Sequence, residues 1–305
     1  MTDATPDHSI RLEFDFQLDQ GRSMGRTGGK GRLGPVVYDG PDLWRTETTP
    51  AGPGTLRIRR DGETAHIDGW GPGLEPMIER VSGFLGGEDD PTRLVAHHPI
   101  VARWAKENPH RRMTATGTIW EHLIPTITGQ KVPGPNNMSA WQGILRRWGH
   151  TAPGPGPETL VRPPDPDVIA GLAYHEFHRF DVERRRAQVI VEVGKRWRRL
   201  EEAAQMEGPA ARKRLEAING IGPWTSSIVT MLSLGDPDAV IVGDYWIPSY
   251  VTHHLVGESR STDERMLEVL EPYKGQRARV QSLAKMAGGL PRYGHRMSLV
   301  DLQGR

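Results

Sequence analysis

Apolar and polar residues alternate along the first part of the chain. The apolar positions of this pattern are Ile10, Leu12, Phe14, Phe16 and Leu18. A period of two predicts a β-strand with one buried face. Shorter strands are predicted at residues 35–38, 43–47, 55–60 and 65–69. Asp61 and Gly62 are typical of a hairpin turn between the last two strands, so we expect an antiparallel sheet.

The apolar spacing changes to three and four after these strands, which predicts helices. A helix at residues 74–85 is expected to lie on the sheet. From about residue 90, further helices are predicted at residues 99–108, 118–131, 139–148, 167–172, 182–199, 201–206, 223–235, 245–256, 261–272 and 276–287. Proline and glycine interrupt this series at residues 132–137 and make residues 151–166 irregular.

The expected fold class is α+β with two domains. Residues 1–90 are predicted to form a β-rich N-terminal domain, an antiparallel sheet with a helix, and residues 91–305 a larger all-helical domain. A chain of 305 residues is long enough for each domain to bury a core. The glycine-rich segment 25–31 has the composition of a phosphate-binding loop. It lacks that motif's spacing and its final Lys-Ser or Lys-Thr pair, so we expect a loop between strands.

The composition is that of an ordinary soluble protein, with 36% hydrophobic and 25% charged residues. No apolar run is long enough to cross a bilayer, and residues 1–14 lack the pattern of a signal peptide. We therefore expect a bacterial-type cytoplasmic protein associated with the nucleoid and no membrane partner. The chain has no Cys, which excludes disulfides, iron–sulfur clusters and thiolate metal sites.

The formal net charge is only +1, but basic residues are concentrated in one part of the chain. They are Arg179, Arg184, Arg185, Arg186, Lys195, Arg196, Arg198 and Arg199, followed by Lys213 and Arg214. Clustered basic side chains predict a phosphate-binding face, although a solvated helix face has the same composition. Arg277 and Arg279 in the last predicted helix are further candidates for contact with a nucleic acid backbone.

A glycine hairpin separates two predicted helices directly after these basic residues. The helix before it breaks at the Asn-Gly-Ile-Gly sequence of residues 219–222, and the next begins at Pro223, a residue suited to the first helical position. Two glycines allow another surface to approach the backbone. The unpaired N–H groups of the following helical turn form a phosphate site. Such a contact binds a nucleic acid strand without reading its sequence. An ordinary helix–turn–helix with the same glycines remains the alternative.

A lone carboxylate, Asp244, follows the second of these helices. It stands after Gly243 and before a helical pattern in which Pro248 is tolerated only in the first turn. Asp244 is therefore placed to cap that helix. An acid close to a phosphate site is also suited to stabilise positive charge on a deoxyribose or to activate water that attacks it. A plain N-cap aspartate is the competing interpretation.

The sequence GIGPWTSS, followed by VGDYW, resembles the helix–hairpin–helix DNA glycosylase superfamily. The most similar branch is the alkylation-repair type, the 3-methyladenine DNA glycosylase II family. The resemblance covers about residues 115–290, and the β-rich module before them is similar to the N-terminal domain of that branch. It implies two helical subdomains that enclose a cleft for the flipped lesion base.

The resemblance implies a role for each matching residue. Phosphate contacts fall to the hairpin and the turn after it, at Gly220, Ile221, Gly222 and Thr225. Hairpin carbonyls of the superfamily often bind K⁺ or Na⁺, and no other cofactor is implied. Asp244 matches the catalytic aspartate. Trp224 stands where bifunctional members carry their Schiff-base lysine, which implies that lyase activity is absent.

The base pocket and the wedge are also implied. The aromatic candidates for stacking on a flipped cationic base are Trp224, Trp246, Tyr174 and Trp120, and core packing is the alternative for each tryptophan. Gln130 and Lys131 match the loop that fills the gap left by the base. Lys131 departs from the usual apolar wedge, and Ile228 from a Tyr found in some pockets.

The expected function is that of a monofunctional DNA glycosylase that releases alkylated purines such as 3-methyladenine and 7-methylguanine and leaves an abasic site. A non-catalytic DNA-damage binder of the same fold and a glycosylase for bulkier or oxidised bases are the alternatives. The expected partner is double-stranded DNA containing damaged bases, and a monomer is expected. The pairs His97-His98 and His253-His254 are adjacent in sequence and rarely share one ion, so no metal site is expected.

Overall fold

A computed structural model describes residues 5–19 and 32–290. The glycine-rich segment 25–31 lies outside these residues. Five strands form an antiparallel sheet in the order β1-β5-β4-β3-β2. They are β1 (His8–Glu13), β2 (Val36–Asp39), β3 (Asp42–Thr49), β4 (Gly52–Asp61) and β5 (Thr64–Trp70). Asp61 pairs with Thr64 across the predicted hairpin turn, where Gly62 has a φ of 60°.

The first strand is shorter than the alternation predicts. Its last pair joins Glu13 to Thr64, the residue at which β5 begins. Beyond this pair, Phe14 and Leu18 donate to the carbonyls of Glu63 and Gly62 in the hairpin turn and do not continue the strand pairing. The chain bends after β1, yet Phe16 and Leu18 remain buried in the core of the sheet. The alternating pattern therefore predicted the burial of Phe16 and Leu18 correctly, but the strand itself ends earlier, at Glu13.

Both faces of the sheet are covered. Helix α2 (Leu74–Phe84) lies on one face and packs Met77 and Val81 against the sheet core. On the other face Trp44 and Trp70 stack with ring centroids 5.7 Å apart, and Leu160 packs against them. The proline-rich segment that supplies Leu160 is not wholly irregular, because it contains the short pair β6 (His150–Thr151) and β7 (Val161–Arg162).

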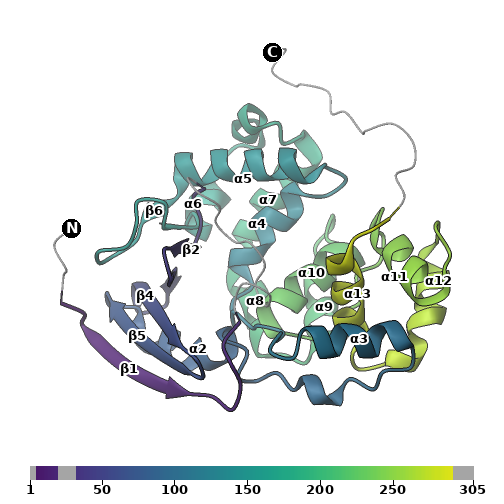
Figure 1. Cartoon of the computed structure of the whole chain (residues 1–305). Helices are drawn as coiled ribbons and strands as arrows, with labels where there is room; N and C mark the ends of the chain where they lie inside the picture. The colour runs from purple at the N-terminus through teal and green to yellow at the C-terminus, as the bar shows by residue number, and fades with distance from the viewer. Residues whose placement is uncertain (1–4, 20–31, 291–305) are drawn as a thin grey trace.

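Helices make up the remainder of the described chain (Figure 1). They are α3 (Pro99–Glu107), α4 (Trp120–Thr128), α5 (Gly134–Trp148), α6 (Pro166–Gly171), α7 (Arg184–Lys195), α8 (Trp197–Glu201), α9 (Gly208–Glu216), α10 (Pro223–Leu234), α11 (Ile247–Val256), α12 (Asp263–Leu270) and α13 (Arg277–Ala287). Short 3₁₀ turns are η1 (Pro91–Arg93), η2 (Tyr174–Phe180), η3 (Glu202–Gln205) and η4 (Glu271–Tyr273). The sheet followed by helices confirms the predicted α+β class.

Several helix boundaries differ from the predicted ones, and α5, α7 and α11 show the physical reasons. α5 begins at Gly134, because Pro135 falls in its first turn, where proline is tolerated. The predicted helix at residues 182–199 is broken at Arg196, whose φ and ψ of −113° and 12° leave the helical region. α11 begins at Ile247, which places Pro248 in the first turn as expected. No helix within residues 5–19 and 32–290 is long and apolar enough to cross a membrane.

The helices form two hydrophobic cores, and α10 lies between them. The first helical core is built from α4 to α9 around buried residues such as Ile124, Phe177 and Ile190. The second helical core joins α3 to α11, α12 and α13 around residues such as Val251 and Val280. Val229 on α10 packs into the first core, while Trp224, Ile228 and Met231 on the same helix pack against the second. The hairpin and Asp244 therefore flank the helix that the two cores share.

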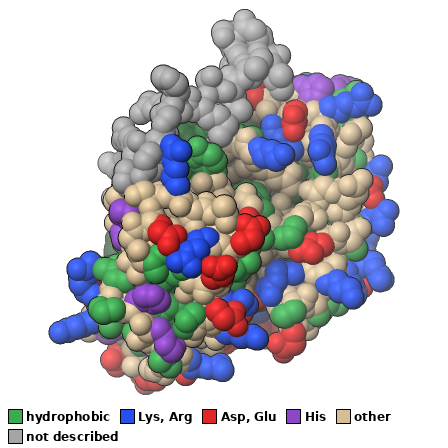
Figure 2. Space-filling model, turned by 90° about the vertical axis from the view of Figure 1, so that its right-hand side faces the viewer, with side chains coloured by type: hydrophobic (Ala, Val, Ile, Leu, Met, Phe, Trp, Pro, Cys, Tyr) green, Lys and Arg blue, Asp and Glu red, His purple; other side chains and the backbone are tan. Residues whose placement is uncertain are grey.

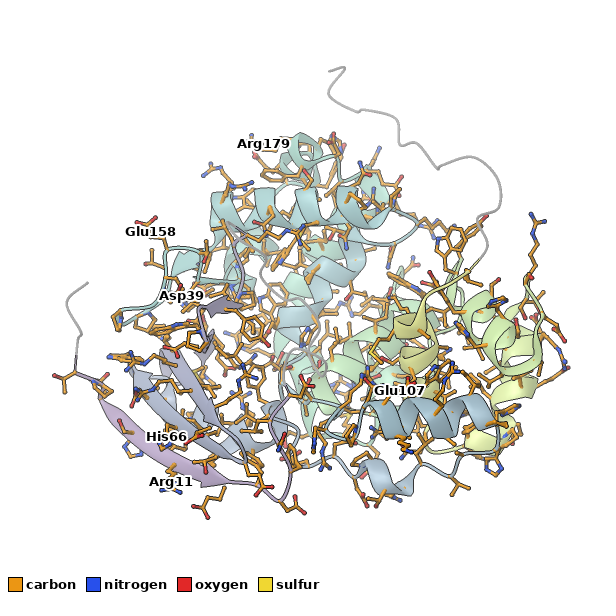
Figure 3. The ribbon with its side chains drawn as sticks, in the orientation of Figure 1. Arg11, Asp39, His66, Glu107, Glu158 and Arg179 are labelled. Atoms are coloured by element: carbon orange, nitrogen blue, oxygen red, sulfur yellow. The ribbon has the colours of Figure 1, made fainter. Side chains whose placement is uncertain are left out.

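Buried charges join the sheet to the first helical core. Arg45 on β3 is 3% exposed and forms ion pairs with Glu47 at 2.7 Å and with Glu121 on α4 at 3.1 Å. Glu201 accepts hydrogen bonds from the backbone N–H groups of Ile119 and Trp120, both at 2.9 Å. Burial raises the pKa of Glu201. In contrast, Arg11 and His66, which pair across β1 and β5, lie on the outer side of the sheet (Figure 3).

Candidate active site

The hairpin is packed tightly against α7. Gly220 has a φ of 99°, and a Cβ built on it would lie 2.3 Å from Cγ2 of Val189. Ile221 is 4% exposed and inserts its side chain into the first helical core. Gly222 differs, because a Cβ at this position would meet no atom within 4 Å. Packing therefore explains the first glycine, whereas the second leaves open space at the surface.

The start of α10 presents unpaired backbone donors. Within residues 5–19 and 32–290, the N–H groups of Gly222, Trp224 and Thr225 form no hydrogen bond. The N–H of Ile221 is used within the hairpin, where it donates to the Ile218 carbonyl at 3.0 Å. The donors of the first helical turn and the positive end of the helix dipole make this a site for an anion.

Gln130 and Lys131 have different environments although they are adjacent. The amide of Gln130 donates from Nε2 to the Gly220 carbonyl and to Oγ1 of Thr225, both at 2.9 Å. Thr225 is only 2% exposed, and its hydroxyl accepts from Gln130. Lys131 is exposed and has a φ of 55° at the tip of the loop. Gln130 thus supports the hairpin, and Lys131 is the member of the pair that projects.

Asp244 is held by three donors from two elements. Oδ1 accepts from the backbone N–H groups of Trp246 at 2.8 Å and Ile247 at 2.9 Å. Asp244 therefore binds the start of α11, but the N-cap residue is Trp246 and not Asp244 as predicted. Oδ2 accepts from the indole Nε1 of Trp224 at 3.2 Å. The carboxylate is half-buried. It is therefore fixed in orientation while one edge stays accessible.

A second carboxylate fixes the residue before Asp244. Oδ2 of Asp263, at the start of α12, accepts from the backbone N–H of Gly243 at 2.7 Å. Oδ1 of Asp263 is buried and has no hydrogen-bond partner within the described part of the chain. Gly243 has a φ of 76°, a conformation that favours glycine. Thr262 is the N-cap of α12 and accepts from the backbone N–H of Arg265 at 3.3 Å. The contact between Asp263 and Gly243 was not predicted from the sequence.

Two exposed aromatic rings follow Asp244. Tyr245 is 72% exposed and Trp246 is 42% exposed, although aromatic side chains are usually covered. Their rings form an edge-to-face pair with centroids 4.8 Å apart. Trp246 was predicted from the sequence as a base-pocket residue and Tyr245 was not. The position of Tyr245 directly after Asp244 was the feature of the sequence that could have identified it. Trp224 is half-buried and offers its indole N–H to Asp244.

Tyr174 and Trp120 are not brought to Asp244. Trp120 lies at the start of α4 and donates its indole N–H to the Pro164 carbonyl at 2.9 Å. The nine residues of α4, roughly 13 Å of helix, separate it from the loop that contacts the hairpin. Tyr174 lies in η2, packs against the first helical core and lines a different groove. Neither ring is therefore part of the arrangement around Asp244.

Several basic side chains that were candidates for phosphate binding instead form contacts within the protein. Arg279 is 3% exposed and forms a buried ion pair with Asp89, so it does not face a ligand. Arg277 is paired with Asp238 through Nε and Oδ1 at 2.8 Å. Arg186 is 7% exposed and donates to the Thr128 carbonyl at 2.6 Å. These side chains brace the helices and do not form a free phosphate-binding face.

The histidine pairs also have protein partners. Nδ1 of His98 lies 2.7 Å from the Tyr273 hydroxyl, and Nε2 of His254 lies 2.7 Å from the Gly288 carbonyl. Within the described ranges, no group of three or more His, Cys, Asp or Glu side chains is arranged to hold a metal ion.

Comparisons with known proteins agree with this geometry. No protein-family model matches the chain. Over 117 residues the chain is 27% identical to YfjP of Bacillus subtilis (strain 168), which is provisionally named a DNA-3-methyladenine glycosylase. That match spans 36% of this chain and 41% of the relative's length.

Solved structures match over nearly the whole chain. A 3-methyladenine DNA glycosylase of Archaeoglobus fulgidus is 18% identical with a TM-score of 0.76, and the match covers 90% of this chain and 97% of that chain. An 8-oxoguanine glycosylase/lyase of Clostridium acetobutylicum, in complex with double-stranded DNA, is 14% identical with a TM-score of 0.67 over 90% and 96% of the two chains. The fold is that of the helix–hairpin–helix DNA glycosylases, as the sequence motifs predicted.

Proposed function

We propose that this protein is a DNA glycosylase of base excision repair. The observation that carries the proposal is the position of Asp244. Its carboxylate is fixed by the Trp224 indole and by two backbone N–H groups at the start of α11. Trp224 itself lies in the first turn of α10, where backbone N–H groups have no hydrogen-bond partner among the described residues. The hairpin would bind a phosphate of the DNA strand, and the target nucleotide would be flipped out so that its sugar meets Asp244. A simple binding protein has no need of an acid held in this way.

The proposed chemistry is hydrolysis of the N-glycosidic bond. As the bond to the base breaks, positive charge develops on the deoxyribose, and an adjacent carboxylate stabilises it. A carboxylate offers about four lone-pair positions, of which three are taken here by recorded donors. The remaining position on Oδ2 is available to the sugar or to the water that attacks it. The base leaves with the bonding electrons, the water oxygen bonds to C1′ of the sugar, and the proton that the water loses passes to Asp244 and from there to solvent.

We further propose alkylated purines as the substrates. A base alkylated at N3 or N7 is already cationic and leaves without strong acid catalysis. Trp224, Tyr245 and Trp246 surround Asp244 with aromatic surface, and a cationic base stacked on such rings gains roughly 0.5–2 kcal/mol for each contact. The similar structures include both alkylpurine and 8-oxoguanine enzymes, so an oxidised purine is the competing substrate.

Lyase activity is not expected in this proposal. A Schiff base requires an amine, and Trp224 occupies the position from which a lysine of bifunctional relatives would act. Lys131 is assigned to the gap that the flipped base leaves, because its exposed side chain follows the anchored Gln130. A K⁺ or Na⁺ ion is proposed at the hairpin. The Gly220 carbonyl already accepts from Gln130, so other hairpin carbonyls would hold it.

The test uses duplexes that carry one 7-methylguanine, one 3-methyladenine or one 8-oxoguanine. We expect release of the free alkylated base and strand breaks only after alkali. Release of 8-oxoguanine alone would assign the oxidised purine as substrate. Breaks without alkali would contradict the monofunctional proposal, and intact bases in all three duplexes would contradict glycosylase activity.

A further inference from the structure

A groove with a volume of about 500 Å³ lies next to the hairpin, on the side of α7. Tyr174, at the start of η2, forms one wall. Arg179, near the other end of the same turn, is labelled in Figure 3. α7 forms the floor and the hairpin the other wall. The lining residues that matter here are Tyr174, Arg185, Gln188, Lys195, Asn219 and Gly220.

The floor of the groove is a polar stripe along α7. Arg185, Gln188, Glu192 and Lys195 are separated by three, four and three residues and therefore share one helix face. Arg185, Gln188 and Lys195 are exposed. Within the described residues neither Arg185 nor Lys195 forms an ion pair, whereas the charge of Glu192 is paired with Arg196. The stripe thus carries two unneutralised positive charges.

The walls add groups that bind nucleotides. The Arg184 guanidinium lies over the Tyr174 ring at 5.0 Å from its centroid, which adds positive charge above the aromatic wall. Asn219 and Gln188 supply amides that both donate and accept hydrogen bonds. Elsewhere the surface is mixed, since acidic and basic side chains are interspersed on the face formed by the C-terminal helices (Figure 2).

We propose that this groove binds the DNA strand that continues from the phosphate held at the hairpin. Gly220 belongs to both the hairpin and the groove, so a strand held at the start of α10 can enter the groove without a break. Arg185 and Lys195 lie near opposite ends of the stripe, roughly 15 Å apart along α7, and contact two phosphates of this strand that are not adjacent. Tyr174 lies against a sugar or a base between them. The inference rests on the proposed function, because it extends the DNA footprint of the same site to the flanking nucleotides.

The test is the double substitution Arg185→Gln/Lys195→Gln, assayed with duplexes that carry a non-cleavable abasic analogue. Each phosphate contact contributes about −0.9 to the slope of log affinity against log salt. We therefore expect the slope of the variant to be shallower by about 2, and its affinity to be lower at low salt. Truncating the duplex on one side of the lesion should abolish the difference between variant and wild type. Truncation on the other side should leave the difference in place.

The control is Arg103→Gln/Lys106→Gln, which removes two exposed basic side chains from α3. Arg103 is paired with Glu107 at 3.7 Å, and Glu107 is labelled far from Arg179 in Figure 3. An unchanged salt slope for the groove variant overturns the proposal. A loss of affinity that persists after truncation of both flanks also overturns it, because the two charges would then act without any flanking nucleotide in the groove. Base release by the wild type is measured separately, so failure of the proposed activity is distinguishable from failure of the groove.

Discussion

Trp224 donates its indole N–H to Oδ2 of Asp244 across 3.2 Å. The two residues come from different elements, since Trp224 is in the first turn of α10 and Asp244 precedes α11. The bond therefore ties the helix that begins at the phosphate-binding hairpin to the loop that carries the acid. Because α10 also packs against both helical cores, the orientation of Asp244 depends on the whole helical part of the fold.

Substitution of Trp224 by Phe tests this link. The ring is retained and the donor is lost, and a hydrogen bond to a charged group contributes about 1.5–3 kcal/mol. We expect single-turnover base release to slow by about 10- to 100-fold. The control is Trp246→Phe, which keeps the backbone N–H that Asp244 accepts from and should affect binding of the base more than the rate. Equal rates for Trp224→Phe and wild type would exclude the indole from the positioning of Asp244.

The two hairpin glycines are expected to respond differently to alanine. Gly222→Ala places its Cβ in open space, so the thermal unfolding midpoint should change little, while the affinity for DNA falls because the Cβ obstructs the approaching backbone. Gly220 has a φ of 99°, and the Cβ of an alanine at this position would lie 2.3 Å from Cγ2 of Val189. Gly220→Ala should therefore lower the thermal unfolding midpoint. Calorimetry and a DNA-binding titration measure both variants. Undiminished DNA affinity in Gly222→Ala would show that the strand does not approach this residue.

Asp263 is predicted to affect the rate of base release through its hydrogen bond with Gly243. Asp263→Ala removes the acceptor of the Gly243 N–H and should lower kcat, since the loop that carries Asp244 loses its fixed conformation. Asp263→Asn keeps an oxygen acceptor and should restore most of the rate. KM should change less than kcat in Asp263→Ala. A variant that loses activity only in proportion to its folded fraction would reduce Asp263 to a structural role.

The buried ion pairs of Arg45 are predicted to maintain the contact between the sheet and the helices. Arg45→Met leaves Glu47 and Glu121 without their shared partner, and removal of one member of a buried pair costs about 3–5 kcal/mol. Chemical denaturation should detect this loss in the free energy of unfolding. Arg11→Met breaks an exposed pair with Glu13 and should leave that free energy within error of wild type. Comparable effects of the two substitutions would contradict the importance of the buried network.

Local chemistry made the hairpin and the acid predictable from sequence. Pro223 at a helix start, glycines before it, and Asp244 before a helix whose first turn contains Pro248 each follow from backbone preferences over a few residues. The alternating strand pattern likewise predicted burial of Phe16 and Leu18, although β1 ends before them.

Contacts between residues far apart in the sequence determine the features that the sequence did not predict. Gln130 bonds to Gly220 across 90 positions and Arg279 pairs with Asp89 across 190, and nothing local to either residue specifies its partner. The same holds for Tyr174 and Trp120, whose aromatic character suits a base pocket but whose elements pack into the first helical core away from Asp244. The aromatic character of these two residues therefore did not predict which residues they contact.

The most direct test of the central claim is single-turnover release of 7-methylguanine by wild type and Asp244→Asn. Asn keeps the shape of the side chain and its Oδ1 acceptor, but it carries no negative charge with which to stabilise the sugar. We predict that release slows by at least about 100-fold, or roughly 2.7 kcal/mol of transition-state stabilisation, while affinity for abasic-analogue DNA stays within a few-fold of wild type. Release by Asp244→Asn at the wild-type rate would contradict the assignment of Asp244 as the catalytic residue.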